Sequence, residues 1–570
     1  MINSFRPIAL VSTLMVSGLS AQTPATTSIL PANPIATLHF DGPAALRAAF
    51  LPTNMGRMFA GPEFNDMVAP FMGMLEGIKG QMGQEAPFDL DALEAAVIDY
   101  RGRLTVGLNV LDESIDFDGD EPNIAFTVAL TPDGDTDLAA MCQALADLAE
   151  EEGGDELSEM GVGGVTLTTV DTGEPFGFTL PFMHKGHAVL LISNDVEMAA
   201  EALLDEGAEV HAPDAGFAKN SIGLSINVKT IADLAYADLE QGEPVATSIM
   251  DIIGLRSLDS VDVTIGASGP AILSETSFTF NNNDRGLLGE LLTGGGQGAG
   301  LIDLLPRNAA TASAMPLNMG GIYEQLMDLV DKVGEAEGNG VNADMLESEF
   351  EGQFGLRLKE DFFDTFSSGL LMTSLESLDA PVGPLAAVEG MSLGLGVRDG
   401  AKLSQTIDSL LREAGLHAGR KSTEYRDYTV YSMNIMMMLP LEYTVTDELL
   451  LVGLGETGGD AVRAVLDEAK DRAEGKEPAP FPKGVADRLR MVQGGWAGLG
   501  WADMGAQMSV VGDQLAMAME MAGGAGGDPS LDILQGLLDA LPPLFEKYEL
   551  QHTVSVIRVD GNRWTQSSIW

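Results

Sequence analysis

Three aspartates in one short acidic run have the spacing of calcium ligands. Asp116, Asp118 and Asp120 alternate in the run DFDGDE. Ca²⁺ is a hard cation that binds carboxylate oxygens, and alternating aspartates open the loop of an EF-hand. The rest of that pattern fails, because Glu121 stands at the sixth position, where glycine is needed, and Thr127 at the twelfth, where glutamate binds. Two interpretations remain open, a weak calcium site and a solvated acidic loop between two strands.

Two glycine motifs match the patterns of other chemistries. Gly390–Gly394 fits the G-x-S-x-G turn of a serine nucleophile, and Gly453–Gly458 fits the G-x-G-x-x-G turn that holds a pyrophosphate. A nucleophile turn has its strand before the serine, whereas here the strand follows it. At the second motif, Glu456 and Asp460 would repel a pyrophosphate. We therefore expect an ordinary strand start and an ordinary strand-to-helix turn.

Histidine, methionine and cysteine offer soft or borderline metal ligands. His184 and His187 flank Lys185-Gly186, which is typical of a hairpin turn and lacks the i, i+4 spacing of a helical zinc site. The 29 methionines are expected to fill apolar cores, with a pliable apolar groove or copper(I) binding as alternatives. Cys142, the only cysteine, lies on the apolar face of a predicted helix, which indicates a buried, inert thiol.

Composition limits the partners of the chain. Its 570 residues are 45% hydrophobic, enough for two domains with their own cores. With 31 basic and 85 acidic residues, the formal net charge is -54. Such a charge repels phosphate, so nucleic acid and anionic membrane surfaces are poor partners. The simplest interpretation of this charge is that it keeps the protein soluble. The alternative is that it forms a site for cations or basic partners.

The N-terminal segment has the pattern of an export signal. Arg6 precedes an apolar run at 8–19, and small residues follow up to Ala21. The run is too short to span a bilayer but suits the core of a signal peptide. We expect a signal peptide at 1–21 and no transmembrane segment after it. The protein is then exported to the periplasm or the exterior of a bacterium.

The sequence repeats itself in a fixed order. Leu30-Pro31-Ala32-Asn33 returns as Leu305-Pro306-Arg307-Asn308, and Leu104–Asp112 returns as Leu371–Asp379. Self-similarity of this kind indicates repeated structural units. We predict two tandem, internally duplicated halves, joined by a Gly-rich linker. Their bounds are 30–283 for the first half, 284–304 for the linker and 305–570 for the second half.

Periodicity predicts the elements of each half. Strands are expected at 35–40, 104–111, 124–130, 165–170, 176–182, 188–192, 221–228, 261–265, 272–280, 370–375, 392–397, 428–438, 448–453, 495–501, 553–559 and 562–569. Helices are expected at 90–97, 138–152, 196–206, 230–239, 403–414, 461–473 and 503–521, with a helical region at 44–82. Adjacent strand pairs between helices predict an α+β fold, in which each half is a mostly antiparallel or mixed sheet with helices packed on it.

The two Leu-Pro-x-Asn openings, at 30–33 and 305–308, each lead into an apolar stretch and then helices. In this they resemble uncharacterised exported bacterial proteins with repeated α+β domains, a domain of unknown function. The resemblance covers 30–570 and implies export and the fold, with no activity to carry over. Duplicated α+β halves are also similar to clam-shell metallopeptidases, and the absence of their H-x-x-E-H motif here implies a non-catalytic relative.

These observations predict an exported, non-catalytic binding or scaffold protein whose ligand is a protein or an apolar molecule. The alternatives are an exported hydrolase with an unrecognised site and a calcium-stabilised surface protein. No catalytic residue and no cofactor other than calcium is predicted. If the halves are copies, the functional residues are expected where the copies differ.

Overall fold

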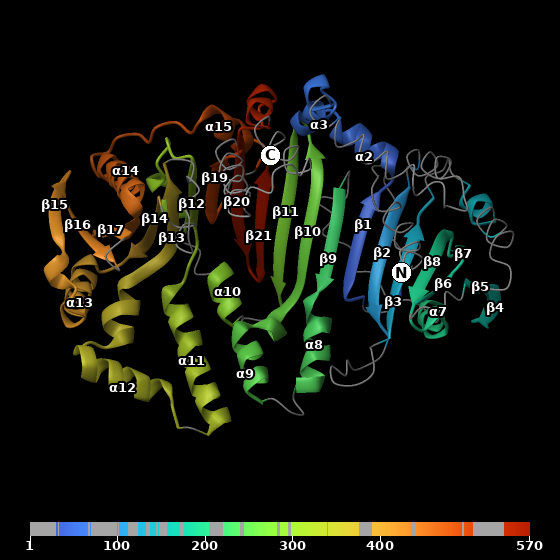
Figure 1. The fold of residues 1–570 in the computed structure, drawn as a ribbon, viewed down its shortest axis with the longest axis horizontal. Helices are drawn as coiled ribbons and strands as arrows, with labels where there is room; N and C mark the ends of the chain where they lie inside the picture. Colours follow the sequence, from blue (N-terminus) through green and yellow to red (C-terminus); the bar gives the residue numbers. More distant parts are fainter. Residues whose placement is uncertain are drawn as a thin grey trace, which may run out of the picture. The chain divides into compact units, whose positions relative to one another are not determined.

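The computed structural model divides into two compact units. Figure 1 labels their helices and strands. Unit 1 comprises residues 1–60, 69–243 and 258–278, and unit 2 comprises 61–68, 244–257 and 279–570. The residues that the structure describes are 30–31, 34–65, 69, 100, 102–111, 123–132, 137–143, 146, 157–170, 176–204, 221–239, 244–281, 286–293, 298–338, 340–375, 390–435, 439–492, 495–504 and 541–570.

Unit 1 contains one large antiparallel sheet. Its strands are β1 (Ala36–Asp41), β2 (Arg103–Val110), β3 (Ile124–Leu130), β4 (Leu157–Val162), β5 (Val165–Val170), β6 (Gly177–Thr179), β7 (Phe182–His184), β8 (His187–Ser193), β9 (Ser221–Asn227), β10 (Leu258–Ser268) and β11 (Ala271–Phe280). The printed pairings give the order β4-β5-β6-β8-β3-β2-β1-β9-β10, with β7 also paired to β8. Its helices are α2 (Pro43–Phe50), α3 (Asn54–Phe59), α7 (Val196–Leu204) and α8 (Val228–Leu239).

Apolar side chains pack on both faces of this sheet. On one face, Phe40, Leu104, Val106 and Val128 form a buried cluster. On the other face, a second cluster joins the sheet to α7, and its members are Leu30, Ala129, Val162, Leu167, Val189, Leu191, Ala200 and Leu203. Alternation along the strands sends successive side chains to opposite faces, which is why neighbouring residues enter different clusters.

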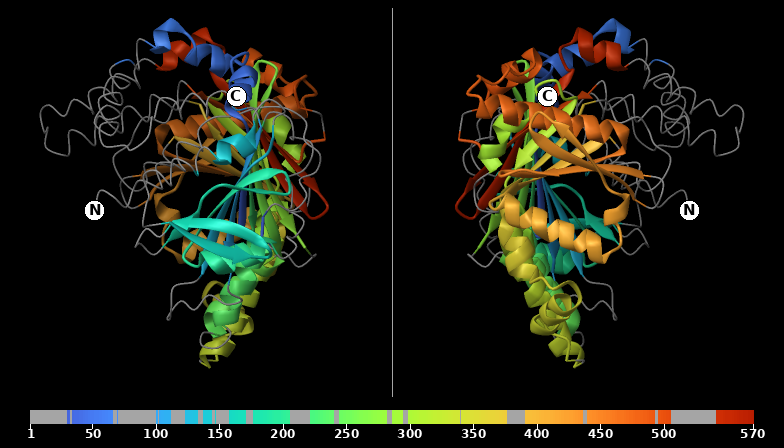
Figure 2. Two further views of the ribbon diagram at one scale, coloured as in Figure 1. Left: turned by 90° about the vertical axis from the view of Figure 1, so that its right-hand side faces the viewer. Right: turned by 90° about the vertical axis from the view of Figure 1, so that its left-hand side faces the viewer.

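Unit 2 is also an antiparallel sheet with helices. Its strands are β12 (Thr311–Met315), β13 (Phe366–Ser374), β14 (Met391–Val397), β15 (Lys421–Tyr425), β16 (Tyr428–Ile435), β17 (Leu439–Val445), β18 (Leu449–Leu454), β19 (Gly498–Asp503), β20 (His552–Asp560) and β21 (Arg563–Ile569). They pair in the order β15-β16-β17-β18-β14-β13-β12-β19-β20-β21. The orange strands β15–β17 are seen in the right-hand view of Figure 2.

Along the chain, the helices of unit 2 lie before and between these strands. They are α9 (Pro244–Ile253), α10 (Gly286–Thr293), α11 (Met319–Glu337), α12 (Ala343–Phe354), α13 (Gly400–Glu413), α14 (Gly455–Ala473) and α15 (Lys483–Leu489). Short helical segments are η4 (Leu255–Ser257), η6 (Gly298–Leu304), η7 (Leu358–Phe362), η8 (Phe363–Thr365) and η10 (His417–Gly419). Within the described residues, no helix combines the length and the apolar character needed to cross a membrane.

The core of unit 2 lies between its sheet and α14. Val462, Val465 and Leu466 are fully buried on one side of α14, a spacing that puts them on one face of a helix. They pack in one cluster with Leu371, Leu451, Leu499, Trp501, Val554 and Val556 of the strands. A smaller cluster, which includes Phe366, Val397 and Leu403, covers the opposite face next to α13.

The predicted α+β class is confirmed, and many elements fall where the periodicity placed them. The strand expected at 124–130 is β3, and the helix expected at 196–206 is α7, capped by Asp195, whose carboxylate accepts the backbone N–H of Met198. Cys142 is a free, buried cysteine, and burial raises the pKa of its thiol. The final hairpin turns one residue later than expected, because Asp560 pairs with Arg563 and leaves Gly561-Asn562 as the loop.

Several elements differ from the expectation. The described part of 284–304, expected as a linker, holds α10 and η6, because Leu301 and Leu304 of η6 belong to the core of unit 2. The helices α9, α11, α12 and α15 were not predicted. Strands β4, β12, β15 and β17 were missed too. The signal peptide expected at 1–21 lies outside the described residues.

Candidate functional site

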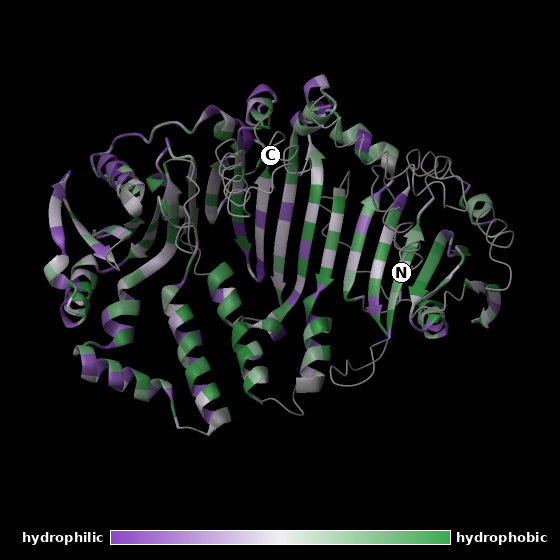
Figure 3. Cartoon of the chain, viewed as in Figure 1, coloured by the Kyte–Doolittle hydropathy of each residue, from purple (hydrophilic) through white to green (hydrophobic). Residues whose placement is uncertain are grey.

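A band of polar side chains crosses one face of the sheet in unit 1. Its members come from β1, β2, β9 and β10, and we call them the polar face: Thr37, His39, Asp41, Arg103, Thr105, Ser225, Ser260, Asp262 and Thr264. All of them except Arg103 are buried. The register places them together, since Thr37 pairs with Ser225 and Ser225 with Asp262. Figure 3 shows hydrophilic and hydrophobic residues alternating along these strands.

Most polar atoms of this face are satisfied within it. Arg103 Nε donates to Asp41 Oδ1 at 2.7 Å. Ser225 Oγ donates to Asp262 Oδ1 at 2.6 Å, and Ser260 Oγ donates to Asp262 Oδ2 at 3.2 Å. Each buried carboxylate therefore has a donor, as buried charge requires.

One row of the polar face contains unsatisfied atoms. His39 pairs with Gly223 on β9, and Gly223 pairs with Thr264 on β10. His39 Nδ1 lies 3.1 Å from Thr105 Oγ1, but His39 Nε2 and Thr264 Oγ1 are buried and have no hydrogen-bond partner among the described residues. Because Gly223 has no side chain, no side chain of β9 lies between His39 and Thr264 in this row. Orphaned buried polar atoms of this kind call for a water or a ligand.

The imidazole of His39 is neutral in this environment. Burial, followed by the nearby Arg103 guanidinium, lowers the pKa of His39 from 6.5 to about 4. The charge of Asp41 is balanced by Arg103 at ion-pair distance. The row therefore offers neutral donors and acceptors to whatever occupies it.

The polar face lacks the arrangement of a catalytic triad. A serine nucleophile donates its hydroxyl hydrogen to a histidine that acts as base. Here Ser225 donates to Asp262 instead, and Nε2 of His39 has no hydroxyl partner. A histidine with a pKa near 4 is also a weak base at neutral pH. This arrangement suits hydrogen bonding to a ligand better than bond cleavage.

His39 gives the stability of the protein a defined pH dependence. In the unfolded chain the imidazole of His39 becomes protonated as the pH falls below 6.5. In the folded chain it stays neutral until about pH 4. We therefore expect the contribution of His39 to the free energy of unfolding to be complete above pH 6.5. It is expected to fall by about 3 kcal/mol as the pH is lowered to 4. Urea unfolding of the wild type and of His39→Gln across this range measures the difference. His417→Gln, at an exposed histidine, is the control, and a difference that stays flat with pH contradicts the assignment.

His39 belongs to none of the motifs that the sequence offers, so sequence reasoning missed this site. A signal was present, since Thr37 and His39 occupy alternate positions of the strand predicted at 35–40, and Asp41 continues the alternation just past its end. Asp262 and Thr264 alternate in the strand predicted at 261–265, with Ser260 just before its start. Alternate positions of a strand share one face, so each triplet indicates a polar face.

The calcium candidates Asp116, Asp118 and Asp120 lie outside the described residues. In the described part of the chain, no group of three or more histidine, cysteine or acidic side chains could hold a metal ion. His184 and His187 face each other across a two-residue turn in which Lys185 and Gly186 both have positive φ. The expected hairpin turn is therefore present. Burial lowers the pKa of both histidines.

The G-x-G-x-x-G motif serves close packing between β18 and α14. A Cβ at Gly453 would lie 2.2 Å from the carbonyl oxygen of Gly458, and one at Gly458 would lie 2.9 Å from that of Met391. Gly455 begins α14 with a φ of 78°. The glycines are thus explained by the expected strand-to-helix turn.

The G-x-S-x-G motif is part of a sheet. Ser392 belongs to β14, pairs with Thr373 of β13 and is fully buried. A nucleophile turn would expose the serine between a strand and a helix. The ordinary strand start expected from the sequence is what the structure contains.

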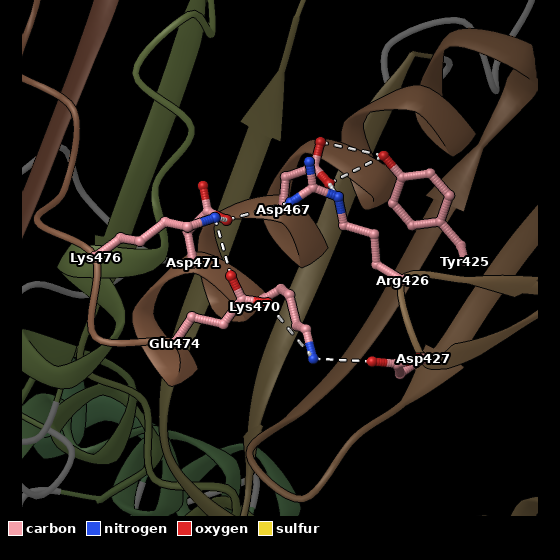
Figure 4. Close-up of polar contacts among 8 residues, drawn as sticks. All are labelled: Tyr425, Arg426, Asp427, Asp467, Lys470, Asp471, Glu474 and Lys476. Atoms are coloured by element: carbon pink, nitrogen blue, oxygen red, sulfur yellow. Dashed lines mark hydrogen bonds and ion pairs between the residues drawn. The ribbon is translucent and has the colours of Figure 1, made fainter.

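Charged residues of α14 hold the turn between β15 and β16 (Figure 4). Arg426 and Asp427, at the tip, have positive φ values of 46° and 71°, which non-glycine residues rarely adopt. Arg426 Nε lies 2.9 Å from Asp467, and Lys470 Nζ lies 2.9 Å from Asp427. These pairs are largely solvent-exposed, so each contributes little and is weakened by salt. The cluster thus connects the β15–β16 turn to α14 and has a structural role.

Comparisons with known proteins assign no relative of known function. No protein-family model matches the chain, and no curated protein matches it. Among solved structures, "Structure of crystal form IV of TP0453" is similar with a TM-score of 0.22 and 9% identity, over 45% of this chain and 81% of that chain. "Structure of crystal form I of TP0453" gives a TM-score of 0.21 and 10% identity, over 46% and 81%. Likeness at this level carries no argument.

Proposed function

We propose that this chain is an exported, non-catalytic binding or scaffold protein built from two copies of one α+β plan, with its ligand site on the polar face of unit 1. Three features of the units support the proposal: the order of the strands, the burial of the repeated leucines and the chemistry of one sheet face.

The order of the strands supports duplication. Unit 1 runs β8-β3-β2-β1-β9-β10 and unit 2 runs β18-β14-β13-β12-β19-β20. Each series takes its strands in the same sequence along the chain, and α7 and α14 follow β8 and β18 respectively. Two unrelated sheets would share so long an order only by coincidence.

The repeated Leu-Pro-x-Asn openings support it as well. Leu30 and Leu305 are both fully buried. Leu30 joins the cluster under α7, and Leu305 joins the cluster under α14. The same residue type thus fills the corresponding place in each unit.

The contrast between corresponding faces carries the binding proposal. In unit 2 the row Ala314–Leu499–Val556 crosses β12, β19 and β20 and is apolar core. In unit 1 the row Thr37–Ser225–Asp262 crosses β1, β9 and β10 and is polar. Replacing apolar core residues by buried polar groups lowers the stability of the fold unless those groups form hydrogen bonds. The neighbouring row, with its orphaned His39 and Thr264 atoms, is where a ligand would use them.

Extraction of the folded full-length chain tests this proposal. We expect a small polar compound to stay with the protein through purification and to appear by mass spectrometry after denaturation. Thr264→Val, which removes one hydroxyl at nearly constant volume, lowers the retained amount several-fold. Thr423→Val, at an exposed position of β15, leaves it unchanged. Equal retention by Thr264→Val and the wild type contradicts the site, and labelling by a serine-hydrolase probe contradicts a non-catalytic function.

A further inference from the structure

Arg307 is a buried cation in unit 2 whose donors are not used. It lies in the loop between η6 and β12 and is only 8% exposed. Within the part of the chain that the structure describes, its Nε and Nη1 are buried with no hydrogen-bond partner. The guanidinium carbon lies 3.8 Å from the centre of the Phe481 ring, so one face of the guanidinium is covered. A partner must therefore approach Arg307 in the plane of the guanidinium.

A second buried arginine in the same unit shows how such a group is normally satisfied. Arg488, in α15, is 6% exposed. Its Nη1 donates to the carbonyl oxygen of Gly484 at 3.1 Å, and its Nη2 donates to that of Glu549 at 2.6 Å, which leaves only Nε without a partner in the described ranges. Arg307 is buried to a similar degree, but in the described part of the chain its Nη1 has no such acceptor. Burial of the guanidinium therefore does not by itself explain the unused donors of Arg307.

The charge of Arg307 is only partly balanced by its surroundings. Burial lowers the pKa of Arg307, while the carboxylates of Glu468 and Asp303 act in the opposite direction. Glu468 accepts a hydrogen bond from the backbone N–H of Arg307. Among the described residues, neither carboxylate accepts from Nε or Nη1 of the guanidinium. Burial also raises the pKa of Glu468, so this carboxylate is itself poorly solvated. A buried charge without a partner at contact distance is costly.

We propose that Arg307 and Phe481 form a binding site for a small carboxylate. A planar carboxylate matches the planar guanidinium and accepts two of its hydrogen bonds. The acids Glu468 and Asp303, together with the net charge of -54, favour a singly charged anion over phosphate, which carries more charge at neutral pH. The first half of the sequence has Ala32 in place of Arg307 within the same Leu-Pro-x-Asn opening, so the site belongs to the second half alone.

Thermal melting of the full chain in acetate, chloride and phosphate at equal ionic strength tests the proposal. We expect acetate to raise the melting temperature above that in chloride, with saturation as its concentration increases. Arg307→Met abolishes the rise, whereas Arg412→Met, at an exposed arginine of α13, retains it. Equal melting in acetate and chloride overturns the site and leaves ordered water as the partner of Arg307. A rise in phosphate alone overturns the assignment to a carboxylate.

A second measurement does not depend on the folding of a variant. Saturation-transfer NMR on wild-type protein detects the acetate methyl group when it binds next to protein hydrogens. We expect transfer to acetate that an excess of propionate suppresses. An absence of transfer overturns the proposal even if Arg307→Met fails to fold. Phe481→Leu, which keeps apolar cover but removes the aromatic face, is expected to weaken acetate binding without abolishing it.

Discussion

Replacing Arg103 by methionine lowers the free energy of unfolding by about 3–5 kcal/mol, because it removes the cation that pairs with a buried carboxylate. The reason is the position of Asp41, whose side chain is 4% exposed and accepts from Arg103 Nε at 2.7 Å. Methionine keeps much of the length of arginine but leaves the carboxylate buried without its cation. Urea unfolding followed by circular dichroism measures the loss.

Two variants separate the ion pair from general damage to the sheet. Adding Asp41→Asn to Arg103→Met removes the unpaired charge, so the double variant is expected to recover part of the lost stability. Lys229→Met breaks an ion pair with Asp233 in which both side chains are more than half exposed, and is expected to change the stability by less than about 0.5 kcal/mol. If Arg103→Met is as mild as Lys229→Met, the polar face is solvated and the interpretation of Asp41 as a buried carboxylate is wrong.

The parts of the fold that the sequence predicted are those with one buried side. Strand β18 and helix α7 each bury one set of regularly spaced side chains, such as Leu449 and Leu451 in β18 and Ala199, Ala200 and Leu203 in α7. A buried face leaves a period of two in a strand and near 3.6 in a helix, which can be read without the structure. The α+β class follows from the order of such elements.

Two of the missed strands, β4 and β15, lack that signal. Strand β15 is exposed at four of its five positions, and β4 is buried only at Val162. An edge strand with both faces in solvent has no apolar alternation, and it forms because its neighbour offers backbone hydrogen bonds. β15 is paired to β16 and β4 to β5 along their lengths. The sequence of such a strand alone does not contain this information.

The candidate site was missed for a related reason. Polar alternation at Thr37, His39 and Asp41 is visible in one strand, but its meaning depends on what lies opposite. His39 and Thr264 share one row of the sheet only because of the register of β1 with β9 and of β9 with β10. A shift of one residue in either pairing would move Thr264 to the other face. Register between segments far apart in the sequence is fixed by tertiary packing.

Shortening Leu30 and Leu305 to alanine tests the duplication, because corresponding residues of two copies should contribute similar amounts to the free energy of unfolding. Each leucine is fully buried at the opening of its own unit. We expect Leu30→Ala and Leu305→Ala each to lower the free energy of unfolding by about 3–5 kcal/mol, since alanine leaves a cavity that the surroundings only partly fill. Leu51→Ala and Leu416→Ala, at leucines that are 40% and 48% exposed, are the controls and are expected to cost far less.

The distribution of tryptophan makes the two effects separable. All four tryptophans, Trp496, Trp501, Trp564 and Trp570, belong to unit 2, so their fluorescence reports on that unit. Leu305→Ala is expected to shift the fluorescence transition in urea to lower concentration. For Leu30→Ala, hydrogen exchange of β2 and β8 in unit 1 is expected to accelerate, because both strands lie under its side chain. If one leucine is costly and the other costs less than about 1 kcal/mol, the two openings have different structural roles and the repeated Leu-Pro-x-Asn motif does not mark two copies of one plan.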